Sequence, residues 1–223
     1  AAAGLGELGG EGAVQEAAIG EVAAGAGMRL LGPNGFGLFV GGLGLNLMAW
    51  RDLPAGRVAL VTQSGNLAIA LSRLMAHAGI GLASCTGLGN QLDLTAADIV
   101  AHHAADPGSD AVALYLEGLR GGEGRRLLAA LEACRDRGKP VVVVKGGRSA
   151  AGARAAATHT GALSGDGRLW DAALDAAGAV TVDSPEAMVD VLAALAALGA
   201  RRAGPGRGAP AAVVLTDGGG DSV

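Results

Sequence analysis

The chain has 223 residues, of which 50% are hydrophobic, 17% are charged and only 2% are aromatic. This composition supports a buried core built mainly from Ala, Val and Leu, and it argues against intrinsic disorder. The net charge of −4, without a basic stripe or interleaved aromatic residues, argues against nucleic acid as a partner.

Residues 1–55 contain one predicted helix and one predicted strand. The helix covers residues 14–24, and the strand covers residues 28–31, just before the turn "GPNGFG". The chain starts without methionine, and at its other end a strand-like segment runs into the glycine-rich "DGGGDSV". We therefore interpret the chain as a fragment that is truncated at both ends.

Residues 56–199 alternate between short apolar strands and helices. Strands are predicted at residues 57–62, 81–86, 110–117, 140–145 and 179–182, and helices at residues 67–77, 95–105, 123–137, 168–177 and from residue 185 onward. Ser184 is the expected cap of the last helix, with Glu186 in its first turn. This alternation predicts a doubly wound parallel α/β sheet, most simply with the strand order 2-1-3-4-5.

Three polar residues follow strands that are neighbours in this order. Ser64 follows the first strand, Glu117 ends the third, and His159 lies in the long loop after the fourth. Ligands of such sheets bind beyond the carboxyl ends of the strands, where the winding reverses. We therefore expect the three residues to converge on one edge of the sheet.

The residue types at this edge suit phosphoryl transfer. Backbone N–H groups at the helix start Ser64-Gly65-Asn66 can hold a phosphate, although an ordinary turn capped by serine would read the same. A neutral imidazole can attack a phosphoryl group through one nitrogen while a carboxylate holds the proton on the other. His159 and Glu117 fit these roles; the alternatives are a loop histidine with an ordinary hydrogen bond and a strand-end acid that faces water.

Five stretches, in order along the chain, resemble the NDP-forming acyl-CoA synthetases, which are relatives of the succinyl-CoA synthetase α chain and of ADP-forming acetate–CoA ligase. The stretches are "GMRLLGPNGFG", "GRVALVTQSGNLAIAL", "GLGNQLDL", "ALYLEGLR" and "KPVVVVKGGRSAAGARAAATHTGALSGDG". The resemblance implies that His159 becomes phosphorylated and that Glu117 orients it. It also implies a phosphate-binding set, Ser64, Gly65 and Asn66, and secondary candidates for contact with CoA or acyl phosphate, Asn34, Gly87, Gly89 and Asn90.

The resemblance also implies a division of the chain. Residues 1–55 correspond to the remnant of a Rossmann-like CoA-binding domain, and residues 56–199 to a flavodoxin-like ligase domain that carries the phosphohistidine. Residues 200–210 correspond to a linker, and residues 211–223 to the start of a third, truncated ligase domain.

The implied reaction forms acyl-CoA from a small carboxylic acid, CoA and ATP, and releases ADP and phosphate by way of an acyl phosphate and phospho-His159. No stretch resembles an ATP-grasp region, which would hold ATP and Mg²⁺. We therefore expect an ATP-grasp domain or subunit as a partner, and an oligomer. Ile69 stands near the place of a tyrosine in succinyl-CoA synthetase, which argues against a dicarboxylate substrate.

Two other functions are compatible with parts of the sequence. A non-catalytic acyl-CoA-sensing module of a protein acetyltransferase would not need a nucleophile, so the pair His159 and Glu117 favours the enzyme. A flavodoxin-like nucleotide-binding domain leaves "THTGA" unexplained and offers few aromatic residues to a flavin.

The remaining polar residues have simpler interpretations. His102 and His103 are adjacent on a helix and point in different directions, so we expect surface residues and no metal site. Lys145 ends the fourth strand at the candidate edge, where it would contact a phosphate or form a structural salt bridge. Cys85 and Cys134 lack the spacing of a metal or redox site, and no signal peptide or membrane span is recognised, so we expect a cytoplasmic protein with reduced thiols and no membrane partner.

Overall fold

The computed structural model describes residues 3–147 and 167–202, with side chains of the last helix described as far as residue 197. The candidate phosphohistidine, His159, and the expected third domain at 211–223 therefore lie outside the described residues.

Within the described residues the strands form one mixed sheet in the order β2-β1-β4-β3-β5-β6-β7. The strands are β1 (Leu38–Val40), β2 (Leu45–Asn46), β3 (Ala55–Thr62), β4 (Leu82–Gly87), β5 (Ala111–Leu116), β6 (Val141–Lys145) and β7 (Val180–Val182). The five strands from β3 to β7 pair in parallel, in the order β4-β3-β5-β6-β7. This is the predicted 2-1-3-4-5 order, so the doubly wound parallel fold is confirmed.

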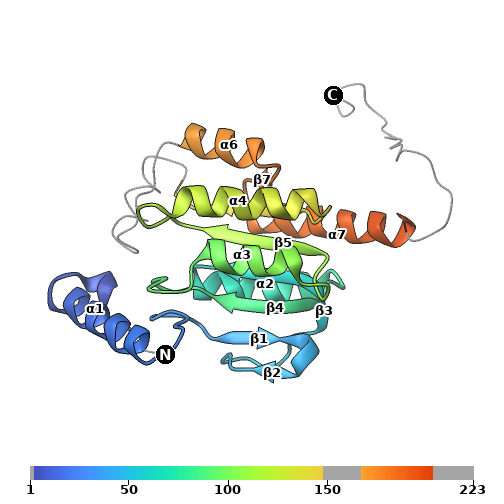
Figure 1. Cartoon of the computed structure of the whole chain (residues 1–223). Coiled ribbons are helices and arrows are strands. Elements are labelled where there is room, and N and C mark those ends of the chain that lie inside the picture. The colour runs from blue at the N-terminus through green and yellow to red at the C-terminus, as the bar shows by residue number, and fades with distance from the viewer. Residues whose placement is uncertain (1–2, 148–166, 203–223) are drawn as a thin grey trace.

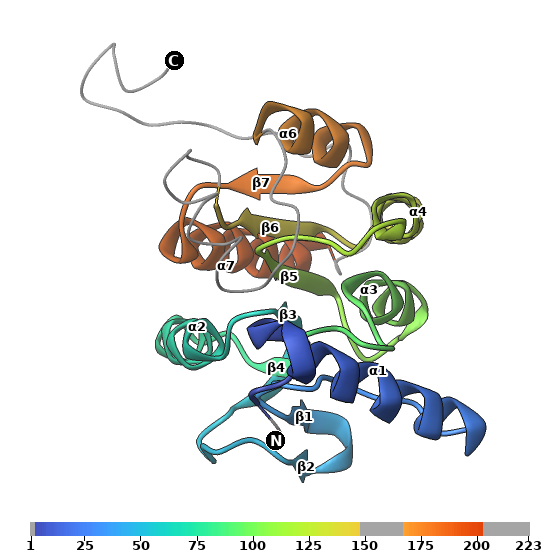
Figure 2. The same ribbon diagram turned by 90° about the vertical axis from the view of Figure 1, so that its left-hand side faces the viewer.

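Helices cover both faces of the parallel strands (Figure 1). The helices of the described residues are α1 (Gly10–Gly25), α2 (Gly65–His77), α3 (Ala96–Ala105), α4 (Glu123–Asp136), α6 (Gly167–Ala176) and α7 (Pro185–Arg202), with two 3-10 turns, η1 (Gly6–Leu8) and η2 (Gly41–Leu43). In Figure 2, α2 and α7 lie on one side of the sheet and α3 and α4 on the other. The last helix extends through Arg202, into the range expected for the linker.

The core has two halves, one on each face of the sheet. Along β6, Val141 and Val143 pack into the half formed with α3, α4 and α6, while Val142 and Val144 pack into the half formed with α2 and α7. A strand buried on both faces is expected to be a continuous apolar run, and "VVVV" has that pattern. Helices therefore cover both faces of the parallel strands, so we expect a ligand to bind at the strand ends.

One strand predicted in the first 54 residues does not form. No strand forms at 28–31; instead, Leu30 and Gly32 accept backbone hydrogen bonds from Leu94 (3.0 Å) and Leu92 (2.9 Å), in the loop after β4. The extended segment is therefore anchored to a loop rather than to a strand.

Two short strands that the sequence pattern did not predict extend the sheet instead. β1 pairs antiparallel with β4, with Phe39 opposite Cys85, and β2 pairs antiparallel with β1. The division of the chain at residue 55 stays a prediction.

Candidate functional site

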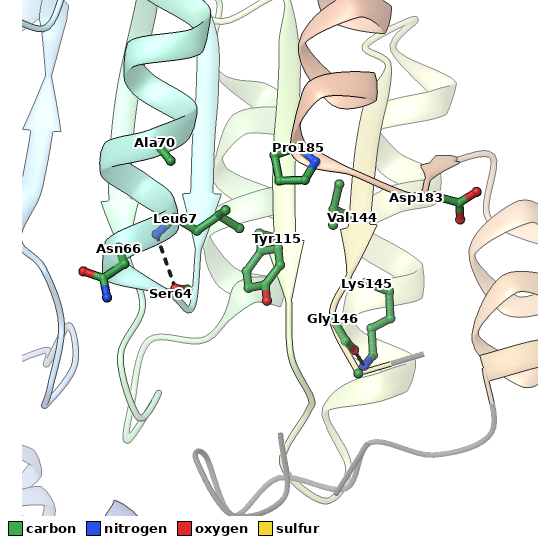
Figure 3. A pocket seen from close by; sticks show the side chains of 11 residues that line it. Ser64, Asn66, Leu67, Ala70, Tyr115, Val144, Lys145, Gly146, Asp183 and Pro185 are labelled. Carbon is green, nitrogen blue, oxygen red and sulfur yellow. Dashed lines mark hydrogen bonds between the residues drawn. The ribbon is translucent and has the colours of Figure 1, made fainter. Parts of the chain in front are cut away.

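The carboxyl ends of β5 and β6 and the starts of α2 and α7 surround a pocket with a volume of about 620 Å³. Its lining includes Ser64 and Asn66 from the start of α2, Tyr115 from β5, Lys145 from β6 and Pro185 from α7. In Figure 3 the Tyr115 ring lies between Leu67 and Lys145. The pocket thus lies at the predicted edge of the sheet, and its walls combine apolar surface with two helix starts.

The turn that starts α2 is held by short-range hydrogen bonds. The Ser64 hydroxyl accepts a hydrogen bond from the Leu67 N–H at 3.4 Å, as a helix cap does (Figure 3). The Thr62 hydroxyl accepts from the Ser64 N–H (3.0 Å) and donates to the Ser64 carbonyl (2.9 Å). A helix start leaves several N–H groups without an intrahelical partner, so the backbone at Gly65 and Asn66 has the chemistry of an anion site.

Gly65 is required for a reason that the sequence did not reveal. A Cβ atom at this position would lie 1.4 Å from Cε2 of Phe36, so the aromatic ring occupies the space that any side chain would need. Phe36 belongs to the turn "GPNGFG", and its ring packs at 6.0 Å from that of Trp50. Because Gly65 has no side chain, the turn at 32–37 can pack against the start of α2.

Glu117 lies directly after β5 and is only 9% exposed. Its N–H donates to Oε1 of Gln63, and its carbonyl accepts from Nζ of Lys145 at 2.7 Å. The interpretation of Glu117 as a strand-end acid that faces water is therefore wrong, because the residue is almost fully buried. Burial of the Tyr115 side chain, together with the negative charge of Glu117 two positions later, raises the pKa of Tyr115.

Lys145 is a buried cation at the same edge, with 4% exposure. Besides the Glu117 carbonyl, its ammonium group donates to the Gly146 carbonyl and lies 5.0 Å from the centre of the Trp170 ring. The ammonium group is thus held at the floor of the pocket by main-chain oxygens, and its alternative role as a phosphate contact stays a prediction.

The four secondary candidates lie where two segments face each other: Asn34 in the turn at 32–37, and Gly87, Gly89 and Asn90 at the end of β4 and in the loop after it. The Asn90 N–H donates to the Pro33 carbonyl at 2.8 Å, and the Asn34 amide donates to Oδ1 of Asn90 at 3.4 Å. Gly89 has a φ of +56°, and a Cβ there would lie 2.0 Å from the Pro33 oxygen. A Cβ at Gly87 would lie 2.7 Å from the Phe36 nitrogen. All four residues therefore serve the close packing of these loops, and a contact with CoA stays a prediction for each.

A buried carboxylate joins these loops to α1. Glu16 is 3% exposed, and it accepts from the Asn90 amide (2.7 Å), from Arg120 (3.0 Å) and from the Gly6 N–H (3.0 Å). The Asn90 amide also donates to Glu7 at 2.7 Å. Sequence reasoning missed Glu16, because an acid on a helix of small residues gives no signal of burial.

Gln63 is the second residue that sequence reasoning missed at this edge. Its side-chain oxygen accepts from the N–H groups of Glu117 and Gly118, and its side-chain amide donates to the Gly118 carbonyl at 2.9 Å. Gln63 thus joins the turn after β3 to the end of β5. These two elements meet as the strand order predicted; whether His159 joins them stays a prediction.

The histidine pair lies at the opposite, amino edge of the sheet, and the prediction for it was half wrong. His102 is exposed, but His103 is 4% exposed, with Nε2 2.9 Å from the Ser84 hydroxyl and Nδ1 3.3 Å from the Ser109 hydroxyl. Burial lowers the pKa of His103 to about 4, so the ring is neutral at pH 7. The helix face that carries His103 packs on the sheet, which buries a residue that local sequence placed at the surface.

The described residues contain one group of potential metal ligands, and it involves this histidine pair. Nitrogen and oxygen atoms of His102, His103 and Asp106 lie within 4.8 Å of one another. The Lys139 ammonium donates to the main-chain carbonyls of His103 (2.7 Å) and Asp106. A fixed positive charge beside the group disfavours a divalent cation.

Cys85 and Cys134 are both buried, free cysteines. Among the helices that the structure describes, none combines the length and the apolar character that a membrane crossing requires.

Comparison with known proteins gives a family match. Residues 55–195 match the family model described as "Succinyl-CoA ligase like flavodoxin domain". The chain is 36% identical to the α subunit of acetate–CoA ligase (ADP-forming) I of Pyrococcus furiosus, over 99% of this chain and 46% of that protein. It is 34% identical to 4-hydroxybutyrate–CoA ligase (ADP-forming) of Nitrosopumilus maritimus, over 84% of this chain and 27% of that protein.

A solved structure is similar over most of the chain. It is the dinucleotide-forming acetyl-coenzyme A synthetase 1 of Ca. Korarchaeum cryptofilum in complex with phosphate and ADP, with a TM-score of 0.80 and 35% identity over 85% of this chain and 40% of that one. The chain therefore spans less than half the length of each of these relatives.

Proposed function

This chain belongs to the succinyl-CoA ligase-like flavodoxin domain family, whose relatives include ADP-forming acyl-CoA ligases, and we propose that it carries the phosphohistidine chemistry of an ADP-forming acyl-CoA synthetase. One observation supports this proposal above all others. The helix start at Ser64 and the buried Glu117 are joined through Gln63, beside a pocket of about 620 Å³. A phosphate cradle and a carboxylate at a fixed separation are what an imidazole nucleophile needs.

In the proposed reaction His159 receives the terminal phosphoryl group of ATP on one ring nitrogen, and ADP leaves. Glu117 holds the proton on the other nitrogen, so that the attacking nitrogen keeps its lone pair. The helix start at Ser64, Gly65 and Asn66 holds the phosphoryl group while it is on the histidine. A carboxylate oxygen of the acid then takes the phosphoryl group from His159, and an acyl phosphate forms. The CoA thiol finally attacks the acyl carbon, and phosphate leaves.

ATP, with its Mg²⁺, is assigned to an ATP-grasp domain or subunit that partners this chain. The Pyrococcus furiosus relative is named as an α subunit, which supports a partner of this kind and an oligomer. The proposal places the whole assembly in the cytoplasm.

The substrate class is a small carboxylic acid. The named acids of relatives include acetate, 4-hydroxybutyrate and succinate, so the family accepts acids of different length and charge. The side chains Leu67, Ala70 and Val144 give the pocket apolar walls, which supports a monocarboxylate over a dicarboxylate.

The test uses the full-length ligase with its ATP-grasp region and γ-labelled ATP. The protein should acquire a label that is labile in acid and stable in base, and His159→Ala should abolish it. His102→Ala is the matched control, because it removes an exposed histidine from the opposite edge of the sheet. Undiminished labelling of the His159→Ala protein would refute the assignment.

A further inference from the structure

The polar contacts at the end of β5 are directed at the main chain of Glu117. On the side of β3, Oε1 of Gln63 accepts from the Glu117 N–H and, at 3.2 Å, from the Gly118 N–H. The other end of the same side chain donates to the Gly118 carbonyl at 2.9 Å. One glutamine side chain thus makes three hydrogen bonds to two consecutive residues, which lie 54 and 55 positions away in sequence.

On the side of β6, the Lys145 ammonium donates to the Glu117 carbonyl at 2.7 Å. Lys145 also donates to the carbonyl of Gly146, which directly follows β6. The main chain of Glu117 is therefore held by hydrogen bonds on both sides. Gln63, directly after β3, accepts from its N–H, and Lys145 on β6 donates to its carbonyl.

These hydrogen bonds are continuous with those of the turn that starts α2. Gln63 lies between Thr62 and Ser64, and the Thr62 hydroxyl bonds both the N–H (3.0 Å) and the carbonyl (2.9 Å) of Ser64. A shift of Glu117 relative to Ser64 would have to break contacts of Gln63. The distance between the helix start and the carboxyl-bearing residue is thereby set.

We propose that Gln63 and Lys145 are positioning residues for phosphoryl transfer, which hold the main chain of Glu117 so that its carboxylate meets the imidazole of His159 while the Ser64 turn holds the phosphoryl group. This inference rests on the proposed function. In this proposal both residues act through the main chain of Glu117.

Burial energetics supports a positioning role over a purely stabilising one. Gln63 is partly buried and Lys145 is buried, so both side chains lose hydration, and hydrogen bonds recover only part of that free energy. The same hydrogen bonds also pair main-chain N–H and carbonyl groups of Glu117 and Gly118, so they contribute to stability as well. What the polar side chains add is direction, since they specify where the peptide groups of residues 117 and 118 must lie.

The decisive experiment is a double-mutant cycle in the full-length ligase. Gln63→Met keeps the volume and removes the three hydrogen bonds; Glu117→Gln removes the carboxylate. The measured quantity is the single-turnover rate of His159 labelling at saturating ATP. Gln63→Met alone should slow labelling by about 10- to 100-fold, the size of effect seen when a reacting group is misplaced. In the Glu117→Gln background, Gln63→Met should slow it by less than about threefold, because the residue through which it acts is already impaired.

Several outcomes would overturn the proposal. Labelling of the Gln63→Met protein at the wild-type rate would do so. A double variant whose rate loss equals the product of the two single losses would do so as well. If Gln63→Met does not fold, Gln63→Glu is the readout, since it keeps an acceptor for both N–H groups. It should label within about tenfold of the wild type, and a slower rate contradicts the proposal.

A matched control separates positioning from stability. Ser109→Ala removes a buried hydroxyl that bonds His103 at the amino edge, so it should lower the melting temperature without changing the labelling rate by more than about twofold. Lys145→Met removes the hydrogen bond to the Glu117 carbonyl. Its effect on the labelling rate should also be smaller in the Glu117→Gln background. If the wild-type ligase itself shows no histidine label, the proposed function is wrong. If the wild type is labelled but the effects of Gln63→Met and Glu117→Gln are additive in free energy, only the positioning role is wrong.

Discussion

The two edges of one sheet use buried and partly buried polar side chains for different purposes. At the amino edge, the ring of buried His103 contacts the hydroxyls of Ser84 and Ser109, and the Lys139 ammonium caps main-chain carbonyls of the adjoining turn. At the carboxyl edge, Gln63 and Lys145 hold the main chain beside an open pocket. These side chains are hydrogen-bonded at both edges, but the carboxyl edge also has two helix starts beside the pocket described above. Position in the sheet, rather than the presence of histidine, therefore identifies the site.

The largest expected effect on stability comes from the amino edge. Burial lowers the pKa of His103 from 6.5 to about 4, so the unfolded chain binds this proton more readily than the folded one. The free energy of unfolding should therefore fall as the pH falls from about 6.5 toward 4, by up to roughly 3 kcal/mol. The charged or titratable neighbours are His102, Asp106 and Lys139, of which Asp106 opposes the shift and the other two support it.

Denaturant unfolding at pH 7 and pH 4.5 measures this effect, with His103→Gln as the variant that cannot titrate. The wild type should lose more stability than the variant over this interval. An identical loss in both would show that His103 is not the group responsible.

The second-largest expected effect concerns Glu117 at the carboxyl edge. Glu117→Gln should slow His159 labelling by about 10- to 100-fold, because an amide does not stabilise the imidazole proton as a carboxylate does. This corresponds to about 1.4 to 2.7 kcal/mol of barrier. The main-chain contacts of residue 117 are unchanged, so the melting temperature should move little. Unchanged single-turnover labelling would remove Glu117 from the mechanism.

A smaller effect concerns Gly65, where the two parts of the carboxyl edge meet. Gly65→Ala places a methyl group where the Phe36 ring lies, and should cost about 2 kcal/mol of stability. Phe36→Ala in the same chain makes room for the methyl group, so the double variant should recover part of the loss relative to Phe36→Ala alone. Thermal unfolding of the three variants tests this; additive losses would contradict the overlap.

The smallest effect tests whether the edges are independent. Ser84→Ala removes the partner of His103 Nε2 and should cost about 1 kcal/mol of unfolding free energy. The labelling rate in the full-length ligase should stay within about twofold of the wild type. A larger change would mean that the amino edge influences the site, and the contrast between the edges would break down.

The order of the parallel strands could be predicted from the sequence, and so could several helix boundaries. Apolar runs and helical segments alternate with clear breaks, and the predicted order agrees with β4-β3-β5-β6-β7. The cap at Ser184 was predicted, and a serine cap was the alternative interpretation of Ser64, because a cap bonds only three positions away, here to Ala187 and Leu67. The strand expected at 28–31 was wrong because an extended apolar segment does not reveal whether its partner is a strand or a loop.

Local periodicity, caps and turns thus determined the layers of this protein and the edge at which a site would lie, since these signals act over a few residues. Only the tertiary structure decided what occupies that edge. Gln63 meets Glu117 across 54 positions, Lys145 meets it across 28, and Gly65 faces the ring of Phe36. The burial of Glu16 and His103 depends in the same way on which helix face packs inward. Contacts of this kind are set by the packing of whole elements against each other, and a single sequence carries no local signal for them.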